Sequence, residues 1–140
     1  MKLSAAFILT VAGALTGCGG MVARHQEVRN DMQRDFAETI PTCISEKECQ
    51  VKWSAARRFV TAHSDWKIQT LTTDFLETYN PRSGDPGLAW SVSKDAASDG
   101  MSYRIVARAR CANMFGCVPD AMKTMIAFNR EVSAAWKPGP

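Results

Sequence analysis

The sequence predicts an α+β domain in which two helices pack on one face of a small antiparallel sheet. Two helical patterns flank a run of strand-like segments, and the strands each have one apolar side. Separate helices and one-sided strands are typical of this fold class. We expect three to four strands in the order α-β-β-β-α, within a single domain over residues 42–137, because 140 residues suffice for one core.

The first helix of this domain is expected over residues 46–63. Ser45 and Glu48 have the spacing of a capping box, which marks a helix N-terminus. Apolar residues then recur at steps of three and four, which places them on one side of the helix. This stripe consists of Cys49, Trp53, Ala56, Val60 and His63.

Residues 66–79 are rich in β-branched and aromatic side chains, a composition that predicts strands. The alternation slips near Thr73, so the pattern leaves open one bent strand with a bulge or two short strands. Residues 80–87 contain two prolines and two glycines and therefore predict a loop.

Two further strands are expected to pair in an antiparallel manner. Residues 88–93 and 103–111 each alternate apolar and polar side chains, and a turn signal stands at residues 99–100. Ala107 and Ala109 fall on the inner side of the second strand. We expect them to lie beneath a helix, where only small side chains fit.

A final helix is predicted to begin with Pro119 as its first residue. Proline is common at that position, and Asp120 complements the positive end of the helix dipole. The apolar stripe of this helix consists of Ala121, Met125, Phe128, Val132 and Ala135.

Residues 1–17 have the features of a secretory signal peptide. Lys2 precedes an uncharged apolar run over residues 3–15, which is shorter than the about 20 residues that a membrane-spanning helix needs. The run ends in Leu15-Thr16-Gly17-Cys18, which resembles the lipobox of bacterial lipoprotein precursors. The resemblance implies cleavage before Cys18 and acylation of that cysteine, with palmitate or a similar chain.

The two residues after Cys18 bear on the destination of such a lipoprotein. They are Gly19 and Gly20, and neither is the aspartate that retains many Gram-negative lipoproteins in the inner membrane. The resemblance therefore implies the outer membrane, with the domain facing the periplasm and the lipid on Cys18 as the membrane contact.

Residues 18–41 are expected to form the lipidated N-terminus and a tether. Val28, Met32, Phe36 and Ile40 recur at four-residue spacing, which would suit a helix that docks on the domain. A flexible tether between lipid and domain is the alternative, and the pattern leaves both open.

Four cysteines remain besides Cys18, and an exported protein meets oxidising conditions, so two structural disulfides are expected. The six-residue spacing favours Cys43 with Cys49 and Cys111 with Cys117, whereas a Cys49–Cys111 cross-link is the main rival. Neither pair has the Cys-x-x-Cys spacing of redox centres or the shorter spacing of most zinc ligands. We expect no metal and no cofactor.

Several other patterns fall short of a recognisable active site. His63-Ser64-Asp65 contains the residue types of a hydrolase triad, but sequence neighbours cannot form that relay, so we interpret them as a helix end. No catalytic residue is predicted. The formal net charge of +3 is too small for a dedicated nucleic-acid binder, and no nucleic-acid partner is expected.

Two sets of side chains have both a functional and a structural interpretation. Arg104, Arg108 and Arg110 share one strand face and would suit anionic headgroups or an acidic partner, although a solvated face is favoured. The four tryptophans would suit a ligand groove, although core packing is favoured.

The resulting functional hypothesis is a non-enzymatic envelope lipoprotein that makes protein contacts or has a structural role near the outer membrane. The alternative is a small-ligand binder or an enzyme whose site has no recognisable motif.

Overall fold

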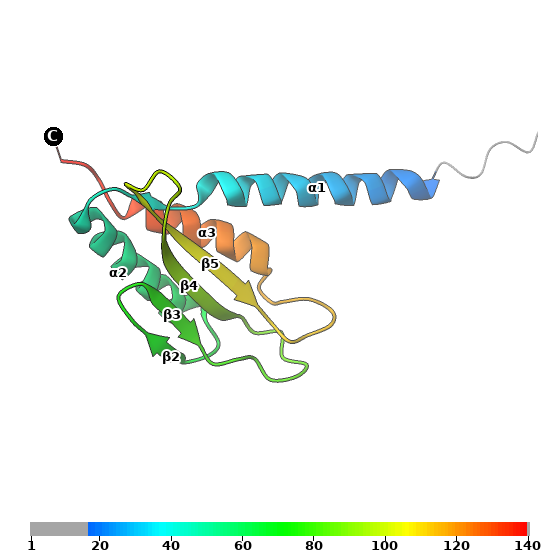
Figure 1. Cartoon of the computed structure of the whole chain (residues 1–140). Coiled ribbons are helices and arrows are strands. Elements are labelled where there is room, and N and C mark those ends of the chain that lie inside the picture. Colours follow the sequence, from blue (N-terminus) through cyan, green and yellow to red (C-terminus); the bar gives the residue numbers. More distant parts are fainter. Residues whose placement is uncertain (1–16, 140) are drawn as a thin grey trace, which may run out of the picture. The chain divides into compact units, whose positions relative to one another are not determined.

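The computed structural model describes the backbone of residues 17–139 and the side chains of residues 21–139 (Figure 1). Except for Gly17, the predicted signal peptide lies outside the described residues, as does the side chain of Cys18. The elements in chain order are α1 (Gly17–Thr39), β1 (Thr42–Cys43), α2 (Glu46–His63), β2 (Ile68–Leu71), β3 (Phe75–Thr78), β4 (Ala89–Ala96), β5 (Tyr103–Arg110) and α3 (Ala121–Ala134).

The chain divides into two units, Met1–Asp31 and Met32–Pro140, with the boundary inside α1. In the first unit, the side chains from residue 21 onward are exposed. No helix among the described residues combines the length and the apolar character that a membrane crossing requires. The second unit contains the sheet, α2 and α3.

Five strands form one antiparallel sheet in the order β1-β5-β4-β3-β2. The α+β class with an antiparallel sheet is confirmed, but the expected three to four strands and two helices are corrected to five and three. Residues 66–79 form two strands, and the Thr72 N–H closes the turn between them by donating to the Phe75 carbonyl at 2.8 Å. The remaining extra strand, β1, pairs Thr42 with Arg104 and Cys43 with Tyr103.

α2 has the bounds that the capping box predicted. The Ser45 hydroxyl accepts a hydrogen bond from the Glu48 N–H at 3.2 Å. The Glu48 carboxylate accepts from the Ile44 N–H at 3.0 Å. In the usual capping box the donor is the N–H of the N-cap residue, here Ser45, so this bond reaches one residue further back. Both bonds satisfy backbone donors in the region where the helix begins.

α3 begins two residues later than predicted. Asp120 is its N-cap, and the carboxylate accepts from the Lys123 N–H at 2.9 Å. Pro119 therefore precedes the cap and is not the first helical residue. The short Asp side chain can bond to the third helical N–H, and that bond decides where the helix starts.

The core lies between the sheet and the two helices α2 and α3, which cover the same face. Three inward side chains of the sheet, Leu76, Val92 and Ile105, are 0% exposed. They pack with residues of both helices. Ala107 is likewise 0% exposed, whereas Arg108 on the opposite face is exposed. The two sides of β5 are therefore those expected from the alternation.

The last turns of α1 dock on α3. Asn129 is fully buried, and its side-chain amide donates to the Phe36 carbonyl at 3.1 Å and to the Thr39 hydroxyl at 3.2 Å. The Arg130 guanidinium pairs with Asp35 at 2.7 Å. Of the two alternatives for this segment, the structure has the docked helix over these turns.

Two disulfides join strand ends to nearby segments. They link Cys43 to Cys49, with Cα atoms 5.2 Å apart, and Cys111 to Cys117, with Cα atoms 5.5 Å apart. This is the local pairing that the spacing favoured, and the Cys49–Cys111 cross-link is not formed.

Candidate binding groove

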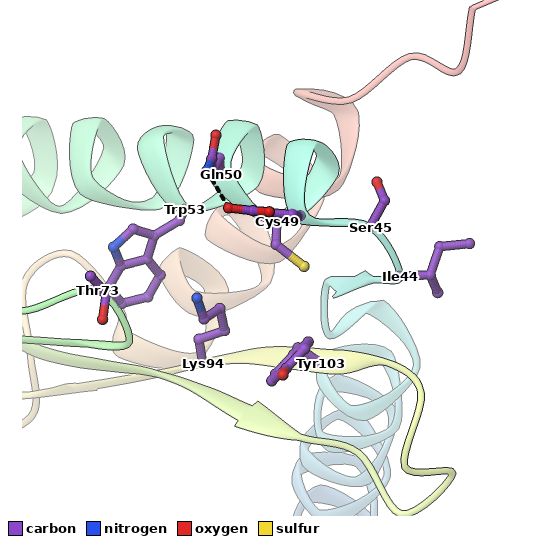
Figure 2. Close-up of a pocket in the computed structure, with 9 residues that line it drawn as sticks. Ile44, Ser45, Cys49, Gln50, Trp53, Thr73, Lys94 and Tyr103 are labelled. Atoms are coloured by element: carbon purple, nitrogen blue, oxygen red, sulfur yellow. Dashed lines mark hydrogen bonds between the residues drawn. The ribbon is translucent and has the colours of Figure 1, made fainter.

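A groove of about 400 Å³ lies between the start of α2 and the inner side of the β4–β5 hairpin (Figure 2). The turn between β2 and β3 closes one side through Thr73. The principal lining residues are Ile44, Cys49, Trp53, Thr73, Lys94 and Tyr103. They come from segments that are distant in the sequence and that the sheet pairing brings together.

Apolar atoms form most of the groove surface, and its large apolar side chains are Ile44, Trp53 and Tyr103. Trp53 projects from α2 and is 8% exposed, so it belongs to the core and offers only part of its indole to the groove. Tyr103 is 44% exposed and Ile44 is 78% exposed. The groove is therefore deep beside Trp53 and open to solvent beside Ile44.

Lys94 is the cation of the groove. It lies on β4 opposite Ile105, on the same strand side as the buried Val92, so its stem leaves the sheet on the inner face. Figure 2 shows Lys94 between Trp53 and Tyr103. The ammonium lies 5.8 Å from the centre of the Tyr103 ring, which is within cation–π range.

No carboxylate among the described residues forms an ion pair with Lys94. The one acidic side chain that lines the groove is Glu46, which accepts a hydrogen bond from Gln50 at 3.1 Å. Lys94 is half-buried as a residue, and an anion bound beside it would supply the opposite charge.

A buried ion pair holds the end of the groove next to β1. Lys52 donates to the Glu48 carboxylate at 2.7 Å and to the Thr42 carbonyl at 2.6 Å, and the side chains of Lys52 and Glu48 are 10% and 12% exposed. Together with the Cys43–Cys49 disulfide, these bonds attach β1 to α2. The segment that carries Ile44 is therefore fixed at both ends.

The pKa of Glu48 is lowered from its ordinary value of 4.5. Burial alone would raise the pKa, because it disfavours the charged carboxylate. The hydrogen bonds from Lys52 and from the backbone near Ile44, with the positive charge of Lys52, outweigh that effect. Glu48 is therefore a carboxylate in the folded protein at neutral pH.

The groove was only partly foreseeable. The apolar stripe predicts Cys49 and Trp53 on the inner side of the first helix, and the alternation that includes Ala107 and Ala109 also predicts Tyr103 on the inner side of its strand. Lys94 was missed, although the alternation through Trp90 and Val92 places it on the same face when it is continued by two residues.

The predicted arginine face is the open side of the sheet. Arg104 pairs with Asp95 in register, and Arg108 with Ser91. Arg110 donates to the Asn80 side chain and lies 3.8 Å from the Glu77 carboxylate. The three arginines thus share a face, with two acidic residues among them.

His63, Ser64 and Asp65 each have a local structural role. His63 Nδ1 lies 2.9 Å from the Phe59 carbonyl. The Ser64 hydroxyl donates to the Trp66 carbonyl, and the Asp65 carboxylate accepts from the Leu88 N–H. The first two contacts are local to the end of α2, and the Asp65 bond attaches the chain after α2 to the residue before β4.

The tryptophans divide between core and surface. Trp53 and Trp90 are buried, and Trp66 and Trp136 are half-buried.

Within the described residues, no three His, Cys, Asp or Glu side chains come together as a metal site would require. The chain matches no protein-family model, no curated protein and no solved structure.

Proposed function

We propose that the protein is a lipid-anchored module of the bacterial cell envelope whose domain binds a partner protein without catalysing a reaction. The anchoring part of the proposal is supported by the lipobox-like Leu15-Thr16-Gly17-Cys18 and by the apolar run before it. Gly19 and Gly20 favour the outer membrane, with the domain in the periplasm.

The binding part of the proposal rests on one observation, the ammonium of Lys94, which has no ion-pair partner among the described residues and lies in a largely apolar groove. The complementary partner carries a carboxylate next to a bulky apolar side chain. In such a complex, the carboxylate binds Lys94 and the apolar side chain packs against the exposed parts of Trp53 and Tyr103. Both features are available in a peptide with an acidic residue or a C-terminal carboxylate.

The shape of the groove favours a peptide over a small molecule. Ile44 and Tyr103 leave one end open to solvent, so a chain that enters beside Lys94 can continue out of the groove. A small ligand is the second candidate, because a volume of about 400 Å³ falls within the range of ligand pockets.

The test is photocrosslinking from the groove in intact cells. A photoreactive phenylalanine analogue at Tyr103 should crosslink one envelope protein, and mass spectrometry should place the crosslink in an acidic segment with a neighbouring apolar residue. Lys94→Glu should lower the yield about tenfold. Lys67→Glu, which changes an exposed lysine outside the groove, should leave the yield within about twofold.

Three outcomes contradict the proposal in different ways. A crosslink that lacks an acidic residue, or a yield that Lys94→Glu does not change, would refute the peptide-binding role. A small molecule that is retained in the groove would favour the second candidate. A mature chain that does not begin at an acylated Cys18, or a Cys18→Ser variant that is still anchored normally, would refute the anchoring.

A further inference from the structure

The loop between β5 and α3 exposes large apolar side chains at its end. Met114 is 89% exposed, Phe115 is 92% exposed and Val118 is 70% exposed. We call these three residues the apolar tip. The loop leaves β5 at the end of the sheet opposite the β4–β5 turn (Figure 1). Three large apolar residues within five positions, all exposed, mark a contact surface better than scattered single residues do.

The apolar tip is held in place by covalent and hydrogen bonds. The Cys111–Cys117 disulfide closes the loop at its base. The Asn113 side chain accepts from the Phe115 N–H at 2.8 Å and donates to the Gly84 carbonyl at 2.7 Å. The loop is therefore a fixed protrusion, and contact with another surface costs little conformational entropy.

The neighbouring loop, residues 80–87, supports the apolar tip from the side. The Gly84 N–H donates to the Ala112 carbonyl at 2.9 Å, and the Ala112 N–H donates to the Asp85 carbonyl at 3.0 Å. The Val118 N–H donates to the Pro86 carbonyl at 2.9 Å. Backbone groups at the base of the tip are thus satisfied within the protein, which leaves the apolar side chains to face outward.

Cations lie next to the apolar tip. Arg110 directly precedes the disulfide, and the exposed Arg82 belongs to the supporting loop. Arg108 lies two residues before Arg110 on the same face of β5, and among the described residues it forms no ion pair. The carboxylate of Asp85 is engaged by the Gly87 N–H at 2.7 Å.

We infer that the apolar tip inserts into the interfacial region of a bilayer that contains anionic phospholipid, while Arg82 and Arg108 bind the phosphate groups. Apolar side chains with flanking cations match the two layers of such an interface. A protruding tip suits a bilayer, whose lipids adapt to its shape, whereas a protein partner would need a matching cavity.

The inference rests on the proposed anchor, because a lipid on Cys18 would keep the domain within a few nanometres of a membrane. At that distance, a contact too weak to recruit a free protein becomes effective. The outer-membrane location would make this surface the inner leaflet of that membrane.

The test places an added tryptophan at the apolar tip of the lipidated protein. Phe115→Trp and Met101→Trp variants are reconstituted in vesicles of phosphatidylethanolamine and phosphatidylglycerol that contain brominated lipid. Met101 is the matched control, since it is 78% exposed and lies just before β5, whereas the apolar tip follows it. β5 has eight residues and therefore a length of about 26 Å. Subtraction of the wild-type signal removes the four native tryptophans.

The expected result is at least about threefold stronger quenching for Phe115→Trp than for Met101→Trp, reduced by Arg108→Ala and by high salt. Equal, weak quenching of both variants in protein that floats with the vesicles would overturn the inference and leave the anchor intact. Protein that does not float would remove the anchor, and the inference with it. Shielding of Phe115→Trp from acrylamide without quenching by brominated lipid would assign the tip to a protein contact.

Discussion

Replacement of Lys52 by methionine should destabilise the domain by about 3 kcal/mol. The change removes the 2.7 Å ion pair with Glu48 and the 2.6 Å hydrogen bond to the Thr42 carbonyl. Loss of one partner of a buried ion pair costs about 3 to 5 kcal/mol. The lower end applies here, because the Glu48 side chain is 12% exposed and keeps its bond from the Ile44 N–H.

Urea unfolding of the protein, followed by tryptophan fluorescence under non-reducing conditions, measures this effect. The matched control is Arg57→Met, which removes an exposed cation from the same helix and should change stability by less than about 0.5 kcal/mol. In the double variant Glu48→Gln with Lys52→Met, the cost should be smaller than in Lys52→Met alone, because no unpaired carboxylate remains. Equal effects of Lys52→Met and Arg57→Met would refute the account of the buried pair.

Three further predictions follow from the fold. The stability advantage of the wild-type protein over Glu48→Gln should be fully present above the ordinary pKa of 4.5 and should be lost as the pH falls through the lowered pKa of the folded state; urea midpoints between about pH 3 and pH 7 measure it, and an advantage that grows on acidification would contradict the assignment. Ala107→Leu should cost about 1 to 3 kcal/mol through overpacking beneath the helices, whereas Arg108→Ala should cost little, and similar unfolding free energies for the two would mean that the strand faces are wrong. Replacement of Cys111 and Cys117 together by alanine should cost about 2 kcal/mol and leave the domain folded by circular dichroism. A non-reducing peptide map of the wild-type protein that links Cys111 or Cys117 to Cys43 or Cys49 would disprove the local pairing.

The sequence was most informative where a local pattern and a local bond coincide. The bounds of α2 could be predicted because Ser45 and Glu48 act within one turn of the helix start. The faces of β4 and β5 could be predicted because apolar and polar side chains alternate over residues 88–93 and 103–111. These features depend on neighbours in the sequence.

Features that depend on distant partners could not be predicted in the same way. β1 has two residues and exists because Thr42 and Cys43 pair with the start of β5, so no periodicity can reveal it. Lys52 does not belong to the apolar stripe of its helix, and it is buried because Thr42 and Glu48 supply acceptors. The groove around Lys94 likewise requires knowledge of how α2 lies over the sheet.

The short disulfide loops have a consequence for the order of folding in the export pathway that we propose. Each bridge joins cysteines six residues apart, whereas a bridge between Cys49 and Cys111 would close a loop of about sixty residues. In an unfolded chain, the shorter closure is favoured by about 2 kcal/mol, or roughly thirtyfold. The correct pairs should therefore form from the disordered chain before the sheet assembles. Maturation then requires an oxidant but little help from a disulfide isomerase, and loss of an isomerase should affect the yield of this protein less than loss of the oxidase.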